Sequence, residues 1–332
     1  MELVNTPEIT IGIMTHNYGR FIKDAIDSVV NQSFKNWELI ISDDASDDGT
    51  EKIVAEYLSD PRISYVKHPI NLGQAKNWAF LLNSGVAPIF AVLHADDYWL
   101  HHIIENAIQG FQDVNTDIIC YNWLTKNNEN ETKLGPNKKC RYTTGMQELK
   151  YQLGYNTFLP SAVFLRRTLI GMVEPPNSTL ILAIDTEYFI RLCIKAKFVK
   201  IINAALLIYR VHENSATIWG VNNRFTYDEQ EYFASLVISH LQTLPHSTRL
   251  YNKFTKRIAK GFILSAFYEV GEGHTDLSLV YLKKALKYDK WGILNFKLLS
   301  VLMVAGTGKL GYKLFLILKK IKIKVYSHSK VL

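Results

Sequence analysis

The stretch that decides the fold is LHADDYW, residues 93–99, which continues the apolar run APIFAVL, residues 87–93. An apolar run of this length, bounded by a glycine and by acids, is typical of a buried strand. Two carboxylates, Asp96 and Asp97, then stand at the carboxyl end of that strand. In open α/β sheets the ligand crevice lies at this edge, where carboxylate oxygens suit Mg²⁺ or Mn²⁺ bound to phosphates. The alternative is that one aspartate caps a helix that starts near Tyr98.

The residues before this stretch alternate between predicted strands and helices. Runs rich in β-formers predict strands at 9–14, 37–41 and 63–66, and apolar residues at helical spacing predict helices near 21–30 and 53–58. Turn-forming loops, THNYG and SDDASDDGT, follow the first two strands. Strands that alternate with helices imply a parallel sheet with its loops on one edge.

Four motifs in this order resemble those of the family 2 glycosyltransferases of the GT-A fold. They are THNY after the first strand, SDDASDDGT after the second, NLGQAKN at 71–77, and HADD at 94–97. The resemblance covers roughly residues 8–215. It implies an α/β fold with a GT-A type nucleotide-binding sheet flanked by helices. It also implies the transfer of a sugar from a nucleotide-sugar donor with inversion at the anomeric carbon.

The resemblance places Thr15 and Asn17 at the nucleotide of the donor, with Asp43 and Asp44 near its base and ribose. A carboxylate can accept a hydrogen bond from the N3–H group of uracil, which favours a UDP-sugar. The alternative is that the polar residues of 43–48 are turn and capping residues ahead of the next helix.

The metal motif departs from the family pattern at one position. The family commonly reads Asp-x-Asp-Asp, whereas this chain has His94-Ala95-Asp96-Asp97. The resemblance makes Asp96 a ligand of the ion on the donor diphosphate, with Asp97 as the second acid. His94 either hydrogen-bonds the ribose or acts as a borderline ligand that favours Mn²⁺. The expected cofactor is therefore Mn²⁺ or Mg²⁺, which neutralises the charge of the departing nucleoside diphosphate.

An inverting transfer needs a general base that takes the proton of the acceptor hydroxyl. The resemblance assigns this role to Asp185, in the segment LAIDTEYFIR at 182–191, with Glu187 as the reserve. An acid at the start of a helix with an apolar face points toward the cavity that the helix borders. The alternative is that Asp185 is the helix N-cap and Glu187 an ordinary acid of the first turn.

The acceptor side is expected around residues 156–167, a predicted loop and strand. In the family this stretch borders the acceptor site, so Pro160 and Ser161 are candidate acceptor residues, together with Trp99.

Three basic side chains are candidates for the donor phosphates. Lys76 stands where the family often has an arginine that faces the nucleotide, and its ammonium group can still meet a phosphate. The segment YRVH at 209–212 matches the family's terminal loop over the diphosphate and supplies Arg210 and His212. The alternatives are a solvated helix lysine for Lys76 and, for Arg210, a structural partner of a sheet-edge carboxylate.

Composition favours a globular chain in the cytoplasm. The chain has 332 residues, 48% of them hydrophobic, which is ample for a GT-A domain and a smaller unit. Three cysteines without metal spacing are typical of reduced thiols. The first residues show no basic region followed by an apolar core, so no signal peptide is predicted.

The net charge of +7 is concentrated at the C-terminal end. Residues 290–332 contain nine lysines and no acid, so the rest of the chain is slightly acidic and we expect no nucleic-acid partner. On a helix, lysines of 309–324 fall on one face and apolar residues on the other. Such a tail is predicted to lie on an anionic membrane surface, or alternatively to be a packing helix with a solvated face. No segment is long enough to span a bilayer.

These expectations combine into one prediction. Residues 1–220 form the GT-A catalytic domain, and residues 221–332 form a helical C-terminal region with a basic amphipathic tail, with a helical hairpin near 224–290. The protein is a metal-dependent hexosyl or N-acetylhexosaminyl transferase. It acts on a lipid-linked or surface-glycan acceptor at the inner face of the cell membrane. Two alternatives are a catalytically silent scaffold that binds nucleotide or glycan, and a nucleotidyltransferase.

Overall fold

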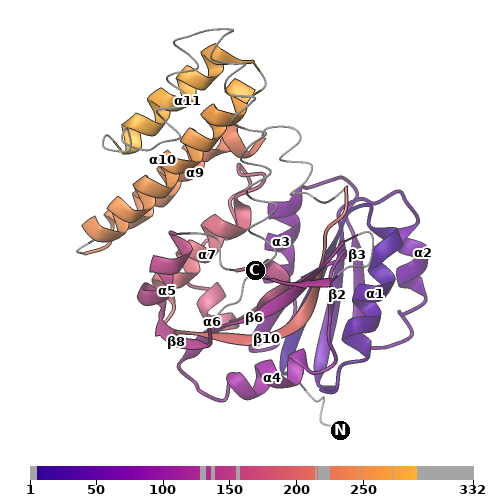
Figure 1. Ribbon diagram of the computed structural model, residues 1–332. Coiled ribbons are helices and arrows are strands. Elements are labelled where there is room, and N and C mark those ends of the chain that lie inside the picture. The colour runs from indigo at the N-terminus through magenta and orange to yellow at the C-terminus, as the bar shows by residue number, and fades with distance from the viewer. Residues whose placement is uncertain are drawn as a thin grey trace. The chain divides into compact units, whose positions relative to one another are not determined.

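The computed structural model describes residues 6–127, 132–135, 139–154, 158–213, 215, 225–245, 247–271 and 273–289. The chain divides into two compact units, Met1–Glu229 and Gln230–Leu332. The first unit holds a mixed sheet covered by helices, and the second unit is helical (Figure 1). The fold class is therefore the one that the sequence predicts.

The N-terminal half of the first unit is a parallel sheet. Its strands lie in the order β3-β2-β1-β4 and all run the same way. Their bounds are β1 Ile9–Thr15, β2 Trp37–Asp43, β3 Ile63–Lys67 and β4 Ile89–His94. The connecting helices are α1 Gly19–Val30, α2 Thr50–Ala55 and α3 Gln74–Leu82. The predicted alternation of strands and helices is confirmed, and the loops after β1, β2 and β4 meet at one edge.

The second half of the sheet is mixed, a feature on which the sequence made no prediction. Strand β9 pairs antiparallel with β4 on one side and with β6 on the other, and the full order is β3-β2-β1-β4-β9-β6-β10-β5. The additional strands are β5 Tyr98–Trp99, β6 Thr116–Lys126, β7 Thr132–Leu134, β8 Arg141–Thr144, β9 Val163–Arg166 and β10 Phe198–Arg210. Helical periodicity gave no sign of this reversal, because β9 follows a short turn rather than a crossover helix.

Neither aspartate of residues 93–99 caps a helix that starts near Tyr98. Residues Tyr98–Trp99 form the short strand β5, paired with β10, and the next helix, α4, begins only at Ile103 and ends at Gly110. Strand β4 is buried along its length until it reaches His94. Asp96 and Asp97 therefore lie in the turn between two strands, as the strand interpretation predicts.

Helix α7, Ile184–Lys195, packs against helix α3 through aromatic side chains. The Trp78 ring of α3 lies 5.2 Å from Tyr188 and 5.9 Å from Phe189, both edge-on. All three side chains are buried. Rings that meet edge-on contribute about 0.5–1.5 kcal/mol beyond their burial. The shorter helical segments nearby are α5 Gly145–Gln152, the 3₁₀ turn Pro160–Ala162, and α6 Arg167–Ile170.

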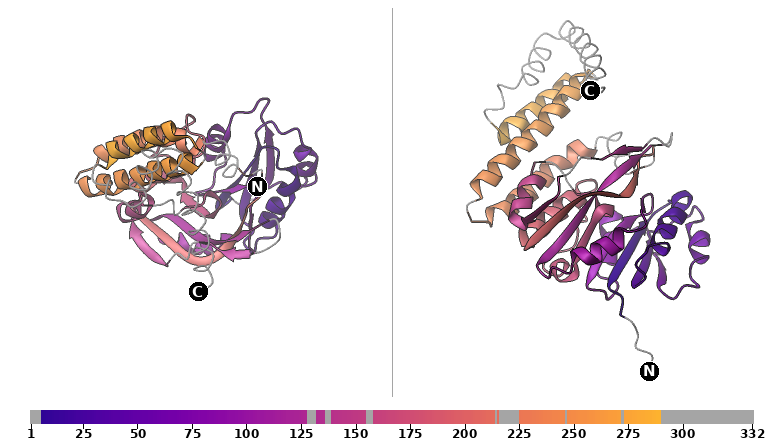
Figure 2. Two further views of the ribbon diagram at one scale, coloured as in Figure 1. Left: turned by 45° about the horizontal axis from the view of Figure 1, so that its top comes forward. Right: turned by 60° about the horizontal axis from the view of Figure 1, so that its bottom comes forward.

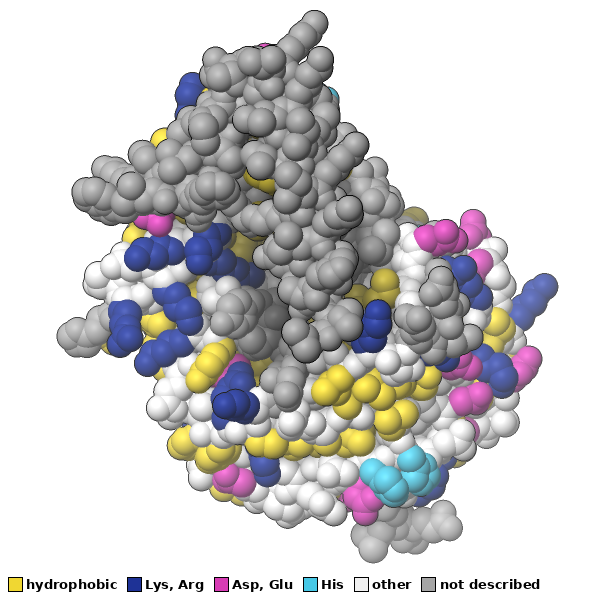
Figure 3. Space-filling model, in the orientation of Figure 1, with side chains coloured by type: hydrophobic (Ala, Val, Ile, Leu, Met, Phe, Trp, Pro, Cys, Tyr) yellow, Lys and Arg dark blue, Asp and Glu magenta, His cyan; other side chains and the backbone are white. Residues whose placement is uncertain are grey.

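The surface of the first unit carries charges of both signs. Figure 3 shows Lys, Arg, Asp and Glu side chains interspersed on the right of the view, where α1 and α2 lie. Ion pairs such as Lys23–Asp27 at 3.4 Å and Lys67–Glu51 at 2.9 Å account for part of this mixture. The three cysteines are free thiols, as composition predicts, with Cys140 exposed.

The second unit contains α10, Thr248–Gly271, α11, Thr275–Tyr288, and most of α9, Phe225–Gln242. The first residues of α9, up to Glu229, belong to the first unit. Helices α10 and α11 run side by side (Figure 2), with Phe262 stacked 6.3 Å from Tyr281 and 5.9 Å from Tyr288. None of the helices in the described part of the chain is both long and apolar enough to cross a membrane. The predicted basic amphipathic tail at 309–324 lies outside the described residues.

We expect Gly85→Ala to lower the free energy of unfolding by about 1–3 kcal/mol, because a side chain would be strained there. Gly85 has φ +74, and a Cβ atom would lie 2.4 Å from Cγ2 of Thr10. Gly49→Ala is the matched control, since Gly49 has φ +87 with nothing within 4 Å of a Cβ atom. Urea denaturation measures both. Equal decreases in the free energy of unfolding for the two variants would contradict the prediction that the clash with Thr10 adds to the strain at Gly85.

Candidate active site

Three potential metal ligands gather at the carboxyl end of β4. His94 is the last residue of β4, and Asp96 and Asp97 follow in the turn to β5. One ligand atom from each of these side chains lies within 4.8 Å of the others. Two carboxylates and an imidazole at this spacing can hold a divalent cation.

Asp97 is the buried anchor of this group. Its side chain is fully buried, and it accepts hydrogen bonds from the Ser161 hydroxyl at 2.6 Å and from the Arg210 backbone N–H at 3.1 Å. Burial raises the pKa of the Asp97 carboxyl well above its usual range, and the neighbouring charge of Asp96 acts in the same direction. A cation would relieve both effects, because it stabilises the ionised form.

Asp96 faces the histidine of the terminal loop. The distance between His212 Nε2 and Asp96 Oδ2 is 3.1 Å, and His212 is buried. The His212 ring lies 4.7 Å from the Phe21 ring, and its Nδ1 is 3.4 Å from Nη2 of Arg20. Because arginine only donates, this contact favours the tautomer that carries its proton on Nε2 and donates it to Asp96.

His94 presents an unpartnered ring nitrogen. Its Nε2 is buried and has no hydrogen-bond partner among the described residues, while its backbone N–H donates to Ser161 Oγ at 3.2 Å. Burial lowers the pKa of the His94 imidazole, and the charges of Asp96 and Asp185 oppose that shift. A neutral imidazole is the form that binds metal ions. Because the charge of Asp185 acts on the pKa of His94, the environment of the cluster includes that carboxylate.

The structure separates the two candidate bases. Both belong to the first turn of α7, and the N-cap is Ala183, so the capping interpretation of Asp185 is wrong. Glu187 is buried, with its Oε1 2.7 Å from Nε of Arg191 and its Oε2 2.8 Å from Nη2. Asp185 is partly exposed and accepts the Thr186 backbone N–H at 2.6 Å. Glu187 is therefore held in a bidentate ion pair, whereas the Asp185 carboxylate remains partly exposed.

The candidate nucleotide residues organise the loops after β1 and β2. Asn17, at φ 58, accepts the backbone N–H of Asp47 at 2.9 Å and so joins the two loops. Asp43 accepts the Ser46 backbone N–H at 2.8 Å and the Tyr65 hydroxyl at 2.6 Å, as the turn interpretation predicts.

Asp44 holds the third loop of this edge. It accepts the backbone N–H groups of Leu72 at 2.5 Å and Gly73 at 2.9 Å, just before α3 begins. Thr15 is buried at the end of β1, and Lys76 is exposed on the first turn of α3. His16, which sequence reasoning missed, lies 2.6 Å from the Asp44 carbonyl oxygen. The position of His16 in the polar loop after β1, between the candidates Thr15 and Asn17, could have indicated it from the sequence.

The three candidate acceptor residues, Trp99, Pro160 and Ser161, are all buried. The Trp99 Nε1–H donates to the Ser161 carbonyl at 2.7 Å, and its ring is stacked 5.2 Å from Phe164. Because the Ser161 hydroxyl is bound to Asp97, these residues brace the acidic cluster, and their polar atoms are engaged inside the protein.

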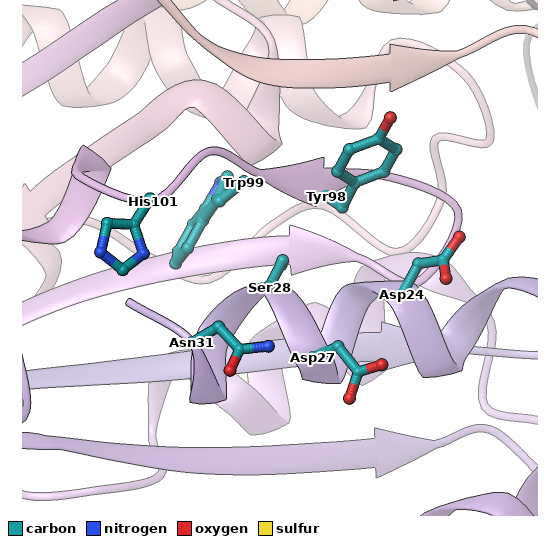
Figure 4. Close-up of a pocket in the computed structure, with 7 residues that line it drawn as sticks. All are labelled: Asp24, Asp27, Ser28, Asn31, Tyr98, Trp99 and His101. Carbon is teal, nitrogen blue, oxygen red and sulfur yellow. The ribbon is translucent and has the colours of Figure 1, made fainter. Parts of the chain in front are cut away.

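Arg210 pairs with a carboxylate, which belongs to a helix and not to a sheet edge. Its guanidinium pairs with Asp24 of α1 and lies 4.7 Å from the Tyr98 ring centroid. Asp24 and Tyr98 also border a surface pocket of about 400 Å³, where Figure 4 shows them at one end and His101 at the other. The side chains that line this pocket come from α1 and from β5 with the residues after it, namely Asp24, Asp27, Ser28, Asn31, Tyr98, Trp99 and His101.

The fold has counterparts among solved glycosyltransferase structures. S. aureus TarS 1–349 in complex with UDP-GlcNAc aligns with a TM-score of 0.68 at 15% identity, covering 85% of this chain and 80% of that one. The mannosyltransferase PcManGT from Pyrobaculum calidifontis, in complex with GDP-Man and Mn²⁺, aligns with a TM-score of 0.59 at 13% identity, covering 98% and 83%. At these identities the likeness shows the fold alone, which is the GT-A fold.

Sequence comparison identifies the family. Residues 10–169 match the model of glycosyl transferase family 2, and the chain belongs to that family. The Escherichia coli protein WfaP, a UDP-Glc:alpha-D-GlcNAc-diphosphoundecaprenol beta-1,3-glucosyltransferase, is 29% identical over 65% of this chain and 80% of its own length. Several other curated relatives match over only about a third of their own length.

We expect Ser161→Ala to lower the free energy of unfolding by about 1–3 kcal/mol, because it removes a hydrogen bond to a buried carboxylate. Ser235→Ala is the control, since the exposed Ser235 hydroxyl bonds only within its own helix, to Tyr232 O. Thermal and urea denaturation measure both variants. A Ser161 variant as stable as the control would show that this hydrogen bond does not stabilise the fold.

Proposed function

We propose that this chain is an inverting glycosyltransferase that moves one sugar from a nucleotide-sugar, with a UDP-sugar favoured, to a hydroxyl of a lipid-linked or surface-glycan acceptor. The observation that carries the proposal is the convergence of His94, Asp96 and Asp97 at the end of β4, with the Asp185 carboxylate close enough to influence His94. Membership of glycosyltransferase family 2 supports it.

The residues at the end of β4 fit a divalent metal. His94, Asp96 and Asp97 would hold it, and His212 contacts Asp96 from the terminal loop. Mixed imidazole and carboxylate ligands favour Mn²⁺ over Mg²⁺, which prefers oxygen. When bound, the ion would neutralise the charge that develops on the departing nucleoside diphosphate. The presence of Mn²⁺ in PcManGT supports this assignment.

The base in this proposal is Asp185. The acceptor oxygen attacks the anomeric carbon from the face opposite the diphosphate, and the bond from that carbon to the diphosphate oxygen breaks. The proton of the acceptor hydroxyl passes to the Asp185 carboxylate. Attack from the opposite face inverts the anomeric configuration. Glu187 is excluded from this role by its bidentate pair with Arg191.

The donor nucleotide would lie over the loops after β1 and β2. Thr15, Asn17, Asp43 and Asp44 belong to this edge, with Lys76 on the first turn of α3. TarS in complex with UDP-GlcNAc and the UDP-Glc donor of WfaP support a uridine nucleotide. The diphosphoundecaprenol-linked acceptor of WfaP supports a lipid-linked acceptor.

We expect the purified chain to release a nucleoside diphosphate from one member of a panel of UDP-, GDP- and dTDP-sugars when Mn²⁺ is present and membrane lipid extract supplies the acceptor. Asp96→Asn should abolish Mn²⁺ binding, measured by calorimetry. Asp185→Asn should lower kcat by about 10²–10⁴-fold, as expected for the loss of a general base, with little change in donor KM. Asp113→Asn, on the exposed turn after α4, is the control.

Two outcomes would favour the alternatives. Donor binding without turnover would point to a scaffold that binds nucleotide or glycan. Release of pyrophosphate, with no effect of Asp185→Asn, would point to a nucleotidyltransferase.

The proposal includes contact with an anionic membrane surface through the C-terminal region, residues 221–332. Besides the predicted tail, α10 supports this contact within the described residues. Its exposed basic side chains repeat every three or four residues and so lie on one face, namely Arg249, Lys253, Lys256 and Lys260. Leu264 and Tyr268, 49% and 46% exposed, continue the same face. Basic and apolar side chains on one face are typical of helices that bind anionic bilayers.

We expect the triple variant Lys253→Glu, Lys256→Glu and Lys260→Glu to reduce binding to phosphatidylglycerol vesicles at least about tenfold. Each lysine near such a surface contributes about 1 kcal/mol. Lys35→Glu, Lys52→Glu and Lys150→Glu change the net charge equally at exposed positions of the first unit and serve as the control. Vesicle sedimentation, with phosphatidylcholine for comparison, measures both. Equal losses would assign the binding to net charge rather than to α10.

A further inference from the structure

The segment that leads into α7 is bound by a carboxylate from a distant helix. Glu229 of α9 accepts the backbone N–H groups of Ile181 at 2.6 Å, Leu182 at 3.1 Å and Ala183 at 2.6 Å. Ile181 and Ala183 use different carboxylate oxygens, Oε2 and Oε1 respectively. One side chain therefore satisfies three consecutive backbone donors.

These donors need an outside partner. Ile181 and Leu182 precede α7, and Ala183 is its N-cap. The N–H group of an N-cap residue has no acceptor within the helix, and the Ala183 side chain cannot cap the helix. Oδ1 of Asp185 accepts the N–H group of the next residue, Thr186, at 2.6 Å. A carboxylate at this end also interacts favourably with the helix dipole, and hydrogen bonds to an ionised acceptor are about twice as strong as neutral ones.

The rest of α7 is held by other means. Tyr188 and Phe189 pack against Trp78, and the Arg191 guanidinium, paired with Glu187, donates to the carbonyl groups of Glu174 and Pro175. Apart from the pair of Glu187 with Arg191, these contacts lie beyond the first turn. The Glu229 carboxylate instead holds the backbone that leads directly into the first turn, which carries Asp185.

We propose that Glu229 is a positioning residue for Asp185: by binding the backbone of 181–183 it sets the direction in which the Asp185 carboxylate faces the donor. This inference rests on the proposed function, in which Asp185 is the base. Asp185 lies two residues beyond Ala183, so a shift of this backbone moves the carboxylate with it. A misplacement of about 1 Å can cost about 100-fold in rate without contact with the substrate.

The experiment compares Glu229→Gln and Glu229→Ala with Glu231→Gln in the full chain. Glu231 is the matched control, because it lies two residues later on α9 and pairs with Lys284 and Lys287 of α11. We expect Glu229→Ala to lower kcat for transfer about 10- to 100-fold, with the KM and the calorimetric Kd of the nucleotide-sugar within about twofold of the parent. Glu229→Gln keeps an acceptor oxygen, so its kcat should lie between those of the parent and Glu229→Ala.

Two results would overturn the inference. One is a kcat of Glu229→Ala equal to that of Glu231→Gln. The other is a loss of activity in Glu229→Gln that merely follows a loss of folded protein in thermal denaturation, with donor affinity falling in parallel.

Asp185→Asn, measured alongside, distinguishes this failure from that of the proposed function. If Asp185→Asn abolishes transfer while the Glu229 variants do not change kcat, only the positioning role is lost. If Asp185→Asn retains transfer, the assignment of the base itself is wrong.

Discussion

The arrangement of the candidate site depends on the burial of one carboxylate. Asp97 is fully enclosed, and its two oxygens accept the Ser161 hydroxyl and the Arg210 backbone N–H. An ionised carboxylate without partners costs several kcal/mol to bury, so each donor is needed for the fold as well as for the site. Residues separated by up to 113 positions in the chain meet at this group, which joins β4 to the 3₁₀ turn before β9 and to the end of β10.

The donor edge is organised before any nucleotide arrives. Asn17 links the loops after β1 and β2, and Asp44 fixes the loop before α3 through two backbone N–H groups. Asparagine and glycine tolerate the left-handed backbone that these tight loops need, at φ 58 for Asn17 and φ +84 for Gly73. Loops held in this way lose less conformational entropy when a ligand binds, which favours a preformed site.

Helix α7 shows how similar acids acquire different roles. Glu187 faces Arg191 one turn later on the same helix, and a bidentate pair of this kind stabilises the protein. The charge of Asp185 acts on His94, and the backbone that leads into its turn is bound by a carboxylate 46 to 48 residues later in the chain. The two acids differ in their partners because of their positions on the helix: Arg191 lies one turn after Glu187 and pairs with it.

Three features could be predicted from the sequence, because they depend on local periodicity and turn chemistry. They are the alternation of strands and helices in the first hundred residues, the acids at the ends of β2 and β4, and the buried strand of residues 87–93. The motifs also identified the family. Tertiary structure decided four other features. They are the antiparallel insertion of β9, the burial of Trp99 and Ser161, the pairing of Arg210 with Asp24, and the binding of Glu229 to the backbone before α7. Each of these brings together residues from distant parts of the chain, and whether a polar side chain faces a ligand or a buried partner depends on which element packs against it.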